Sequence, residues 1–600
     1  MSRLDGVTSD GLPVAPSMEP ALAAAHVPPR STLVDARVVF ICALAMAVAL
    51  AAGGVAQLLT RLIGLVTNLS FYGRLSTAFV SPAGHHLGAA VIVVPVVGGL
   101  LVGLMARYGS RAIRGHGIPE AMEQVLTNQS RIPARMTFLK PLSAALAIGT
   151  GGPFGAEGPI IATGGALGSL LGQWVHVSAQ ERKTLLAAGA AAGMAATFGS
   201  PVSAVLLAVE LLLFEYRPRS LIPVSFAASV ATAVRYAFVG SAAVFPMSDL
   251  SQPSGGALAT YIGIGALIGV AAVLVTRAVY AVEDGFEKLP IHWMWWPALG
   301  GVAVGLVGYV APRTMGVGYD NIEAIVAGHL TGSALAILCT FKLVSWCIAL
   351  GSGTSGGTLA PLFTVGGGLG ALLGSAAAAL LPSVGIDARV AALVGMAAIF
   401  AGASRALLAS VVFAFETTRQ PLGLLPLLGG CAAAYLISCL AMRHSIMTEK
   451  IARRGLHVAG EYVADFLSSR PVRDHMSAAV VTLPADQRLD EARQFIASHG
   501  TGARHQGFPV LDPHGRLVGV LTRRDLTDPD RDGAEPLRAL VKKPPIVLFD
   551  DGTLRDAVDQ MARAAVGRLP VLSRADGRLC GIVSRSDVLV AEARRLAEHH

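Results

Sequence analysis

The stretch GGPFGAEGPIIATGGALGSLLG, residues 151–172, recurs as GTSGGTLAPLFTVGGGLGALLG at residues 353–374, with ten identities in 22 positions at an offset of 202. The same offset places GMAATF (193–198) on GMAAIF (395–400), where five of six positions are identical. Two separate blocks that keep one offset indicate an internal duplication, because chance matching of glycine-rich sequence has no reason to preserve spacing. The duplication predicts two structural repeats with a functional site where they meet.

Composition places both repeats in a membrane. Of 600 residues, 53% are hydrophobic and 14% are charged, whereas a soluble domain carries about 25% charged residues. Several apolar segments are shorter than the ~20 residues that cross a bilayer, which indicates broken and re-entrant helices. We therefore expect an all-α polytopic membrane protein with a C-terminal α/β domain. The transmembrane domain is expected over 35–456, with repeats at about 38–240 and 255–445.

The C-terminal part of the chain differs in charge from the rest. Residues 471–600 hold 19 basic and 18 acidic side chains, a density typical of a soluble domain. Nearly all of the net charge of +8 therefore belongs to residues 1–470, the body of the chain. Basic residues at the cytoplasmic ends of membrane helices account for this charge. This distribution argues against nucleic-acid binding. The six cysteines have no metal-like spacing and predict packing roles, with no metal site.

The tail contains a smaller repeat. FPVLDPHGRLVGVLTRRDL (508–526) aligns with LPVLSRADGRLCGIVSRSDV (569–588) when one inserted residue is allowed. In each copy a strand-like apolar run is followed by Gly, then by Thr or Ser, then by Asp, and an amphipathic stretch precedes the run. The other expected divisions of the chain are a proline-rich flexible leader (1–34), a linker (457–470) and two α/β copies (471–527 and 537–597).

Three glycine-rich turns in the body each precede a helix with proline near its start. They are GHGIP (115–119), GAEGP (155–159) and GGTLAP (356–361). Proline suits the first helical turn because its missing N–H would be unpaired there, and glycine allows close approach of a ligand. Free N–H groups and the helix dipole attract anions, which otherwise lose their water at a cost of tens of kcal/mol. Each turn alone could simply break a helix, but the three together predict an anion site.

The same turns resemble the signatures of the CLC family of chloride channels and chloride/proton antiporters. The family's GSGIPE, GREGP and GGxFAP are GHGIPE, GAEGP and GGTLAP in this sequence, and the resemblance covers about 38–455. It implies an inverted repeat, a homodimer with one pore in each subunit, and chloride or a similar small anion as the transported ion, with protons as a second substrate in the antiporters. It also implies a multi-pass protein of the cell (inner) membrane, in contact with lipid, whose tail is cytoplasmic.

The resemblance assigns the gate and the anion ligands. Glu157 corresponds to the family's gating and proton-transferring glutamate, and a tethered carboxylate beside a helix start can compete with an anion for the same place. Backbone N–H groups at 117–118 and 358–359 are expected to be the main ligands. The full set of anion-binding residues expected from the motifs is His116, Gly117, Ile118, Gly155, Ala156, Gly158, Thr358, Leu359 and Met447.

Three positions depart from the family pattern. His116 stands where the family has Ser or Pro, and its imidazole either donates to the anion or packs away in the loop. Met447 stands where the family offers a tyrosine hydroxyl. Leu211 replaces the antiporters' inner proton-accepting glutamate, which leaves a channel and an antiporter both open. Glu210, its neighbour, and Glu416 are expected to cap or pair within the protein.

The tail resembles a pair of CBS domains. In that family a Gly-x-x-Thr/Ser-x-x-Asp pattern binds adenosine nucleotides, with the hydroxyl on phosphate and the carboxylate on ribose. No cofactor is required for transport, and adenine nucleotide binding and ligand-free packing both remain open for the tail. The pattern is intact in both copies, as Gly519, Thr522 and Asp525 and as Gly581, Ser584 and Asp587.

Two other functions compete with anion transport. A divalent-cation carrier with regulatory CBS domains should place acidic or carbonyl ligands in the pore, whereas these repeats offer helix starts and one carboxylate. A membrane nucleotide sensor that transports nothing should have degenerate pore motifs. The sequence holds no catalytic triad, metal cluster or phosphate loop, so no enzymatic activity is expected.

Overall fold

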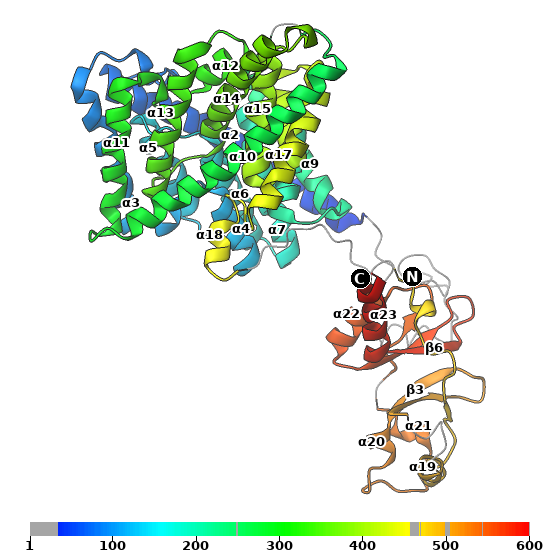
Figure 1. Cartoon of the computed structure of the whole chain (residues 1–600). Helices are drawn as coiled ribbons and strands as arrows, with labels where there is room; N and C mark the ends of the chain where they lie inside the picture. The colour runs from blue at the N-terminus through cyan, green and yellow to red at the C-terminus, as the bar shows by residue number, and fades with distance from the viewer. Residues whose placement is uncertain are drawn as a thin grey trace. The chain divides into compact units, whose positions relative to one another are not determined.

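The computed structural model describes residues 34–247, 250–456, 467, 470–498, 505–542 and 544–598. The chain divides into a membrane unit (Val34–Tyr462) and a tail unit that includes Val463–His600 (Figure 1). The expected leader and most of the expected linker lie outside the described residues.

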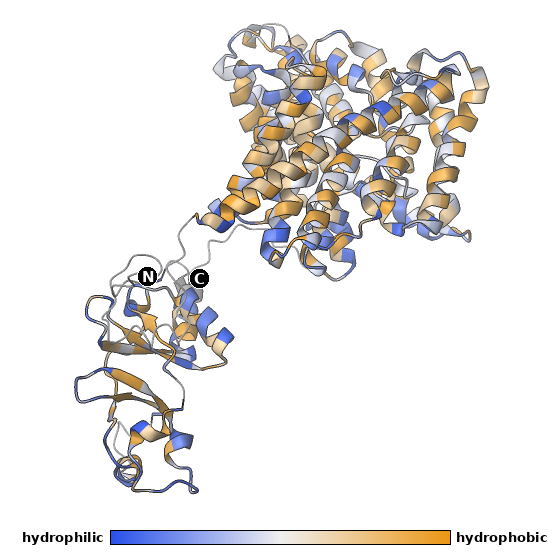
Figure 2. Cartoon of the chain, turned by 180° about the vertical axis from the view of Figure 1, so that it is seen from behind, coloured by the Kyte–Doolittle hydropathy of each residue, from blue (hydrophilic) through white to orange (hydrophobic). Residues whose placement is uncertain are grey.

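The membrane unit is built of two series of helices that match each other in order. Eight helices among the described residues are long and apolar enough to cross a membrane, and Figure 2 shows hydrophobic residues along the helices of this unit. Apolar helices of 10–17 residues accompany them, as expected for broken helices. The first series is α2 (Ala36–Tyr72), α3 (Val93–Tyr108), α4 (Ile118–Thr127), α5 (Met136–Gly149), α6 (Glu157–Trp174), α7 (Ala179–Phe198), α8 (Pro201–Ala208) and α9 (Pro218–Val239). The second is α10 (Gly255–Glu287), α11 (Trp296–Val310), α12 (Tyr319–Val326), α13 (Gly332–Gly351), α14 (Leu359–Leu380), α15 (Ala388–Ser404), α16 (Leu407–Thr418) and α17 (Leu424–Ala441), followed by α18 (Glu449–Arg453).

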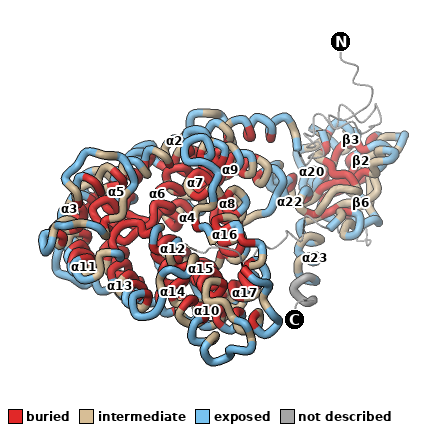
Figure 3. The backbone as a smooth tube through the Cα atoms, turned by 90° about the horizontal axis from the view of Figure 1, so that it is seen from above, coloured by how far each residue is buried: buried red, intermediate tan, exposed pale blue. Residues whose placement is uncertain are grey.

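Glycine and alanine bring the central helices into close contact. Helix α6 packs on α7, and α14 packs on α15; α7 and α15 are almost entirely buried (Figure 3). A Cβ atom on Gly164 would lie 2.1 Å from the carbonyl oxygen of Gly189, and one on Gly366 would lie 2.5 Å from that of Gly395. Both repeats therefore use small residues to let backbones approach, as membrane helices commonly do.

A local two-fold relation between the repeats is visible in the backbone. Gly155 and Gly357 occupy equivalent positions of the duplicated stretch and bond to each other. The Gly155 N–H donates to the Gly357 carbonyl at 3.2 Å, and the Gly357 N–H donates to the Gly155 carbonyl at 2.8 Å. Reciprocal bonds between equivalent residues are what a two-fold axis produces. The repeats therefore meet within the stretch that revealed the duplication.

Two glutamates exchange helix caps across the interface between the repeats. Glu210 accepts hydrogen bonds from the N–H groups of residues 408 and 409, at the start of α16, at 3.0 and 3.1 Å. Glu416, near the end of α16, accepts from the N–H groups of residues 202 and 203, at the start of α8, at 3.0 and 2.9 Å. The prediction that both acids have structural roles is confirmed. Each carboxylate accepts from N–H groups at the start of a helix in the other repeat, which have no acceptor within their own helix.

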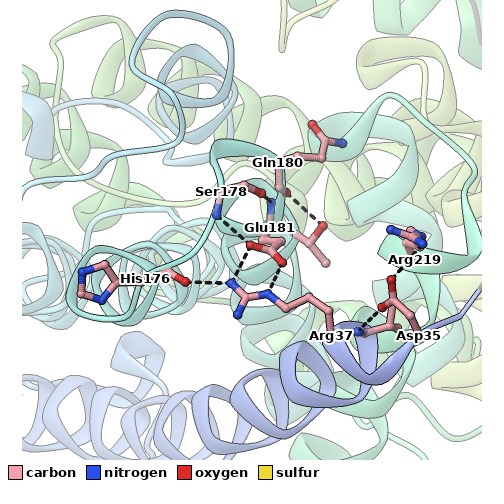
Figure 4. A network of polar contacts seen from close by, with 9 residues as sticks. Asp35, Arg37, His176, Ser178, Gln180, Glu181 and Arg219 are labelled. Atoms are coloured by element: carbon pink, nitrogen blue, oxygen red, sulfur yellow. Dashed lines mark hydrogen bonds and ion pairs between the residues drawn. The ribbon is translucent and has the colours of Figure 1, made fainter. Parts of the chain in front are cut away.

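At one end of the membrane unit, polar side chains fix the first helix to its neighbours (Figure 4). Arg37, near the start of α2, donates to both carboxylate oxygens of Glu181 at 2.6 and 3.0 Å and to the His176 carbonyl at 2.7 Å. Asp35 caps α2 and pairs with Arg219 at 3.0 Å. Exposed pairs of this kind contribute little stability each, but together they set where α2 begins.

The described residues of the tail unit form two three-stranded sheets of the same order. In the first copy, β1 (Leu483–Pro484) runs parallel to β2 (Gly507–Leu511), which pairs antiparallel with β3 (Leu517–Thr522). The second copy repeats this with β4 (Leu548–Phe549), β5 (Arg568–Leu572) and β6 (Leu579–Ser584). The accompanying helices are α19 (Leu489–Ala497), α20 (Arg523–Leu526), α21 (Leu537–Leu540), α22 (Leu554–Ala564) and α23 (Arg585–Glu598). The expected α/β class of the tail is confirmed.

Candidate functional site

The three glycine-rich turns meet in the core of the membrane unit. We refer to GHGIP as the first turn, GAEGP as the second and GGTLAP as the third. The first turn forms a parallel bridge to the segment that leads into the third, through Gly115 and Ser355. The second turn bonds to the third through the Gly155–Gly357 pair. Helix starts from both repeats therefore converge on one place.

Only glycine fits where the first and second turns touch. Gly117 has a φ of 94°, which side chains strongly disfavour, and a Cβ there would lie 2.6 Å from the Gly158 carbonyl oxygen. A Cβ on Gly158 would lie 2.1 Å from the His116 carbonyl oxygen. The starts of α4 and α6 are thereby in direct contact, which places the positive ends of two helix dipoles side by side.

Glu157, the first residue of α6, places its carboxylate at this meeting point. Its side chain is fully buried, and Oε1 accepts a hydrogen bond from the Tyr319 hydroxyl at 2.8 Å. Oε2 has no hydrogen-bond partner among the described residues. It lies beside the glycine pair, since a Cβ on Gly357 would come within 3.0 Å of it. A buried charged oxygen without a donor is costly, so this carboxylate gains from moving away or from taking up a proton.

The start of α14 offers free donors beside this carboxylate. The N–H groups of Thr358 and Leu359, like that of Ile118 at the start of α4, make no backbone hydrogen bond within the described part of the chain. The Thr358 hydroxyl is also buried without a partner there. Gly117 differs from the expectation, because its N–H donates to Glu120 Oε2 at 2.7 Å. Glu120 stands at the third position of α4 and closes the helix start in the manner of a capping box, so the first turn has one free donor fewer than expected.

All residues predicted to bind the anion are buried. His116 Nδ1 has no hydrogen-bond partner among the described residues. The Met447 N–H donates to Ser445 Oγ at 3.3 Å, and the nearby Tyr280 hydroxyl donates to the Ile446 carbonyl at 2.8 Å, so that hydroxyl hydrogen is already engaged. The buried residues are His116, Gly117, Ile118, Gly155, Ala156, Gly158, Thr358, Leu359 and Met447.

Two buried lysines behind the turns were not predicted. Lys140 on α5 donates to two backbone carbonyls of the segment before α4, both at 2.8 Å. Lys342 on α13 donates to two carbonyls of the segment before α12, at 2.9 and 3.0 Å. The lysines are 202 residues apart, which is the offset of the duplication, and each stands in an apolar run. Either feature of the sequence could have identified them as candidate functional residues. Their charges add to the positive potential that helix starts create near the turns.

Tyr319 is a further residue that sequence reasoning missed. It is the first residue of α12 and follows GVG (316–318), the counterpart of GHG in the first turn. Its ring meets Phe198 and Phe245 edge-on, with 5.7 and 6.2 Å between ring centroids. These contacts orient the ring so that its hydroxyl stays on Glu157. The GVG turn indicates that a helix starts at Tyr319, but it does not indicate the contact with Glu157, because the two residues belong to different repeats.

Leu211 lies in the π-helical turn (Val209–Leu213) that follows α8, and its side chain is buried. Its neighbour Glu210 is engaged in capping α16. An apolar side chain cannot take up a proton, so position 211 contributes no proton acceptor to the membrane unit.

In the tail, the hydroxyl and carboxylate of the predicted nucleotide pattern form helix caps. The Thr522 hydroxyl donates to Asp525 Oδ2 at 2.6 Å, in a capping box at the start of α20. Ser584 and Asp587 make the same contact at 2.7 Å at the start of α23. In both copies, the hydroxyl and the carboxylate of the pattern therefore cap a helix start. They make this cap without any bound nucleotide.

The glycines of that pattern make close contacts with neighbouring side chains. A Cβ on Gly519 would lie 2.3 Å from Val541 Cγ1, and one on Gly581 would lie 2.4 Å from Met476 Sδ. Beside the first copy lies a cavity of about 230 Å³, lined in part by Asp525, Asp528, Arg531 and Lys542.

Comparison with protein families matches both units. The family described as "Voltage gated chloride channel" matches residues 98–439, and the CBS domain family matches residues 472–529 and 537–594.

The chain is also similar to related proteins in sequence and to solved structures in fold. An H(+)/Cl(-) exchange transporter ClcA of Vibrio parahaemolyticus is 30% identical over 374 residues, which cover 61% of this chain and 79% of that protein. A putative chloride channel protein ClcB-like of Ralstonia nicotianae is 28% identical over 368 residues, covering 61% of this chain and 86% of that protein. The crystal structure of a slow cyanobacterial Cl-/H+ antiporter aligns with a TM-score of 0.62 at 22% identity, covering 70% of this chain and 98% of that one. That of a eukaryotic CLC transporter aligns at 0.56 and 23%, covering 92% and 97%.

Proposed function

This chain belongs to the voltage-gated chloride channel family, and from that premise we propose that it carries chloride or a similar small anion across the membrane with Glu157 as its gate. The observation that supports this best is the place of the Glu157 carboxylate. It is buried where the three turns meet, with one oxygen held by Tyr319 and the other without a donor. A charged carboxylate there repels an anion, whereas a neutral one that turns away leaves the helix-start donors free.

The geometry favours this function over its two competitors. A divalent cation would meet two buried lysines and the positive ends of helix dipoles at this place, which repel it. A sensor that transports nothing has no need for buried, unpaired donors that converge between two repeats. Such donors are costly unless a ligand satisfies them.

We test the proposal by chloride efflux from proteoliposomes, with proton movement recorded in the same sample and no imposed pH gradient. Chloride flux that drives protons uphill establishes an exchanger whose inner proton path does not use position 211. Chloride flux without proton movement establishes a channel or uncoupled carrier, with Leu211 as the reason. The absence of chloride flux above that of empty liposomes refutes anion transport.

We further propose a lipid-embedded homodimer with one pore in each subunit, in the inner cell membrane, with the tail in the cytoplasm. Figure 1 places the starts of α2 and α7 at the same end of the membrane unit as α18. Basic side chains gather at these elements, among them Arg37, Lys183 and Arg453. A basic end faces the cytoplasm in most membrane proteins, and the chain continues from α18 into the tail.

For the tail we propose CBS domains at 471–527 and 537–597 behind a transmembrane domain at 35–456, and an adenine nucleotide site at the first copy. The cavity that Asp525 lines supports this site. Asp525→Ala, alone or with Asp587→Ala, should abolish nucleotide binding to the full chain in calorimetry. Asp556→Ala is the matched control, because Asp556 makes an equivalent capping box with Thr553 at 2.8 Å. Equal binding losses in both variants, or no binding by the unchanged protein, contradict the proposal.

A further inference from the structure

The segment between α2 and α3 folds back over the end of α2, and we call its residues 74–84 the strap. Asn68, one turn before the end of α2, donates its side-chain amide to the Ser76 carbonyl at 3.1 Å and to the Ala78 carbonyl at 2.8 Å. Gly64 leaves room for the strap, since a Cβ there would lie 2.6 Å from one of its carbonyl oxygens. Because Asn68 is fully buried, water does not compete for these hydrogen bonds. The strap is therefore firmly attached to α2.

The strap is also attached to the second repeat. The Tyr72 hydroxyl, at the end of α2, donates to the Ser81 carbonyl at 2.6 Å. Pro82 lies against the GVG turn before α12, because a Cβ on Gly316 would lie 3.0 Å from Pro82 Cγ. The strap thus connects the end of α2 to the helix start that carries Tyr319.

Between these two attachments the strap places the ring of Phe79 on the ring of Tyr319. The two rings are stacked, with 6.3 Å between their centroids and 22° between their planes. Phe198 and Phe245, which meet the same Tyr319 ring edge-on, are buried. Phe79 is 46% exposed. Of these three rings, Phe79 is therefore the one that stands between Tyr319 and the solvent.

The strap lies at the end of the membrane unit opposite α18. Helix α2 starts at the end that holds α18, and its 37 residues are enough to cross a membrane. Its last residue and the strap that follows are therefore at the other end, where Figure 1 also shows α12. Phe79 covers Tyr319 from that face of the membrane.

We propose that Phe79 is a lid that keeps water of this face away from the hydrogen bond between the Tyr319 hydroxyl and Glu157, and so stabilises the closed position of the carboxylate. This inference rests on the proposed function and deepens it, because it names what shields the gate from one face. A hydrogen bond that water cannot reach is stronger than an exposed one, because water competes for both partners. Phe79 acts through Tyr319 and is a positioning residue.

The test is chloride flux from proteoliposomes at a pH where the gate is mostly closed. Phe79→Ala should raise this flux by about threefold, because it exposes the hydrogen bond to water without removing either partner. Phe79→Tyr keeps the ring and should leave the flux unchanged. Leu75→Ala is the matched control, because Leu75 is an apolar residue of the same strap that is 85% exposed; it should also leave the flux unchanged.

A combination of variants separates a lid on Tyr319 from a general loosening of the fold. In a protein that already carries Tyr319→Phe, the shielded hydrogen bond is gone, so adding Phe79→Ala should not raise the flux further. A further rise as large as that of Phe79→Ala alone would show that Phe79 acts independently of Tyr319 and would overturn the proposal. Unchanged flux in the single variant Phe79→Ala overturns it as well.

Infrared spectroscopy keeps this test apart from the test of transport. The carboxylate band of Glu157 is identified as the band that is missing in Glu157→Gln. It should shift in Phe79→Ala, where water reaches the hydrogen bond, and stay in place in Leu75→Ala. That shift in a protein without chloride flux supports the lid and refutes the proposed function. Chloride flux with an unshifted band overturns the lid and leaves the proposed function standing.

Discussion

The two repeats share a backbone and differ at the residues that act. Both pack glycine on glycine, both bury a lysine behind a turn, and each caps a helix of the other. At the start of α6 stands Glu157, whereas the equivalent position at the start of α14 is Leu359. Duplication thus supplies the paired helix starts, and the residue that we propose as the gate stands in one repeat only. The equivalent helix starts of the two repeats form the site together. The difference between Glu157 and Leu359 is what we propose makes anion passage controllable.

The largest effect should come from removing the ionisable carboxylate that the first repeat has at Glu157 and the second repeat lacks. Glu157→Gln keeps the shape of the side chain but cannot ionise, so anion flux should lose its dependence on pH, together with any proton movement. Flux measured across a range of pH tests this. Glu181→Gln, at the exposed polar end of α7, serves as control and should keep the response. A Glu157→Gln protein that still responds to pH would falsify the gate assignment.

The next largest effect tests what the repeats share. Lys140→Met and Lys342→Met each leave two buried carbonyls without a donor, and we expect each to lower the free energy of unfolding by about 2–5 kcal/mol. Thermal unfolding of the purified protein in detergent measures this. The two losses should be similar, because the two environments are equivalent. A loss confined to one lysine would show that the repeats are not energetically alike.

A smaller effect should follow from Tyr319→Phe, which removes the hydrogen bond that holds Glu157 in place. The charged carboxylate loses about 1.5 kcal/mol of stabilisation in the closed position. Flux at a pH where the gate is mostly closed should therefore rise by about tenfold. Tyr309→Phe is the control, because it removes a hydroxyl from an exposed ring on α11 and should leave this flux unchanged. Lower flux in Tyr319→Phe would mean that the hydroxyl serves the open state instead.

The smallest effect should come from the exchanged caps. Glu210→Gln and Glu416→Gln keep an acceptor oxygen but lose its charge, and each should cost about 1 kcal/mol of stability. Because the two caps are equivalent, chemical unfolding should give the same loss for each. Their combined loss should fall short of the sum if the caps form one cooperative unit, because either single change already removes the coupling between them. Strict additivity would show that the two helix starts are fixed independently.

Sequence reasoning reached the repeats, the family and the convergence of the turns because these are properties of spacing and residue type. It also reached the structural use of Glu210 and Glu416. It did not find that Glu120 takes the Gly117 N–H, although Glu at the third helical position is a known capping pattern. It could not find the Tyr319–Glu157 bond, because two side chains from different repeats meet only once both have folded. Contacts of that kind have no local signal in the chain.

The exchanged caps bear on how the protein is made. The start of α8 depends on Glu416, which is synthesised more than 200 residues later. A ribosome that has finished the first repeat therefore releases into the membrane a helix whose leading amides have no partner, and in lipid such groups cannot turn to water. We expect this helix start to be completed only when the second half has been made. Separately expressed halves should survive only when they are produced together.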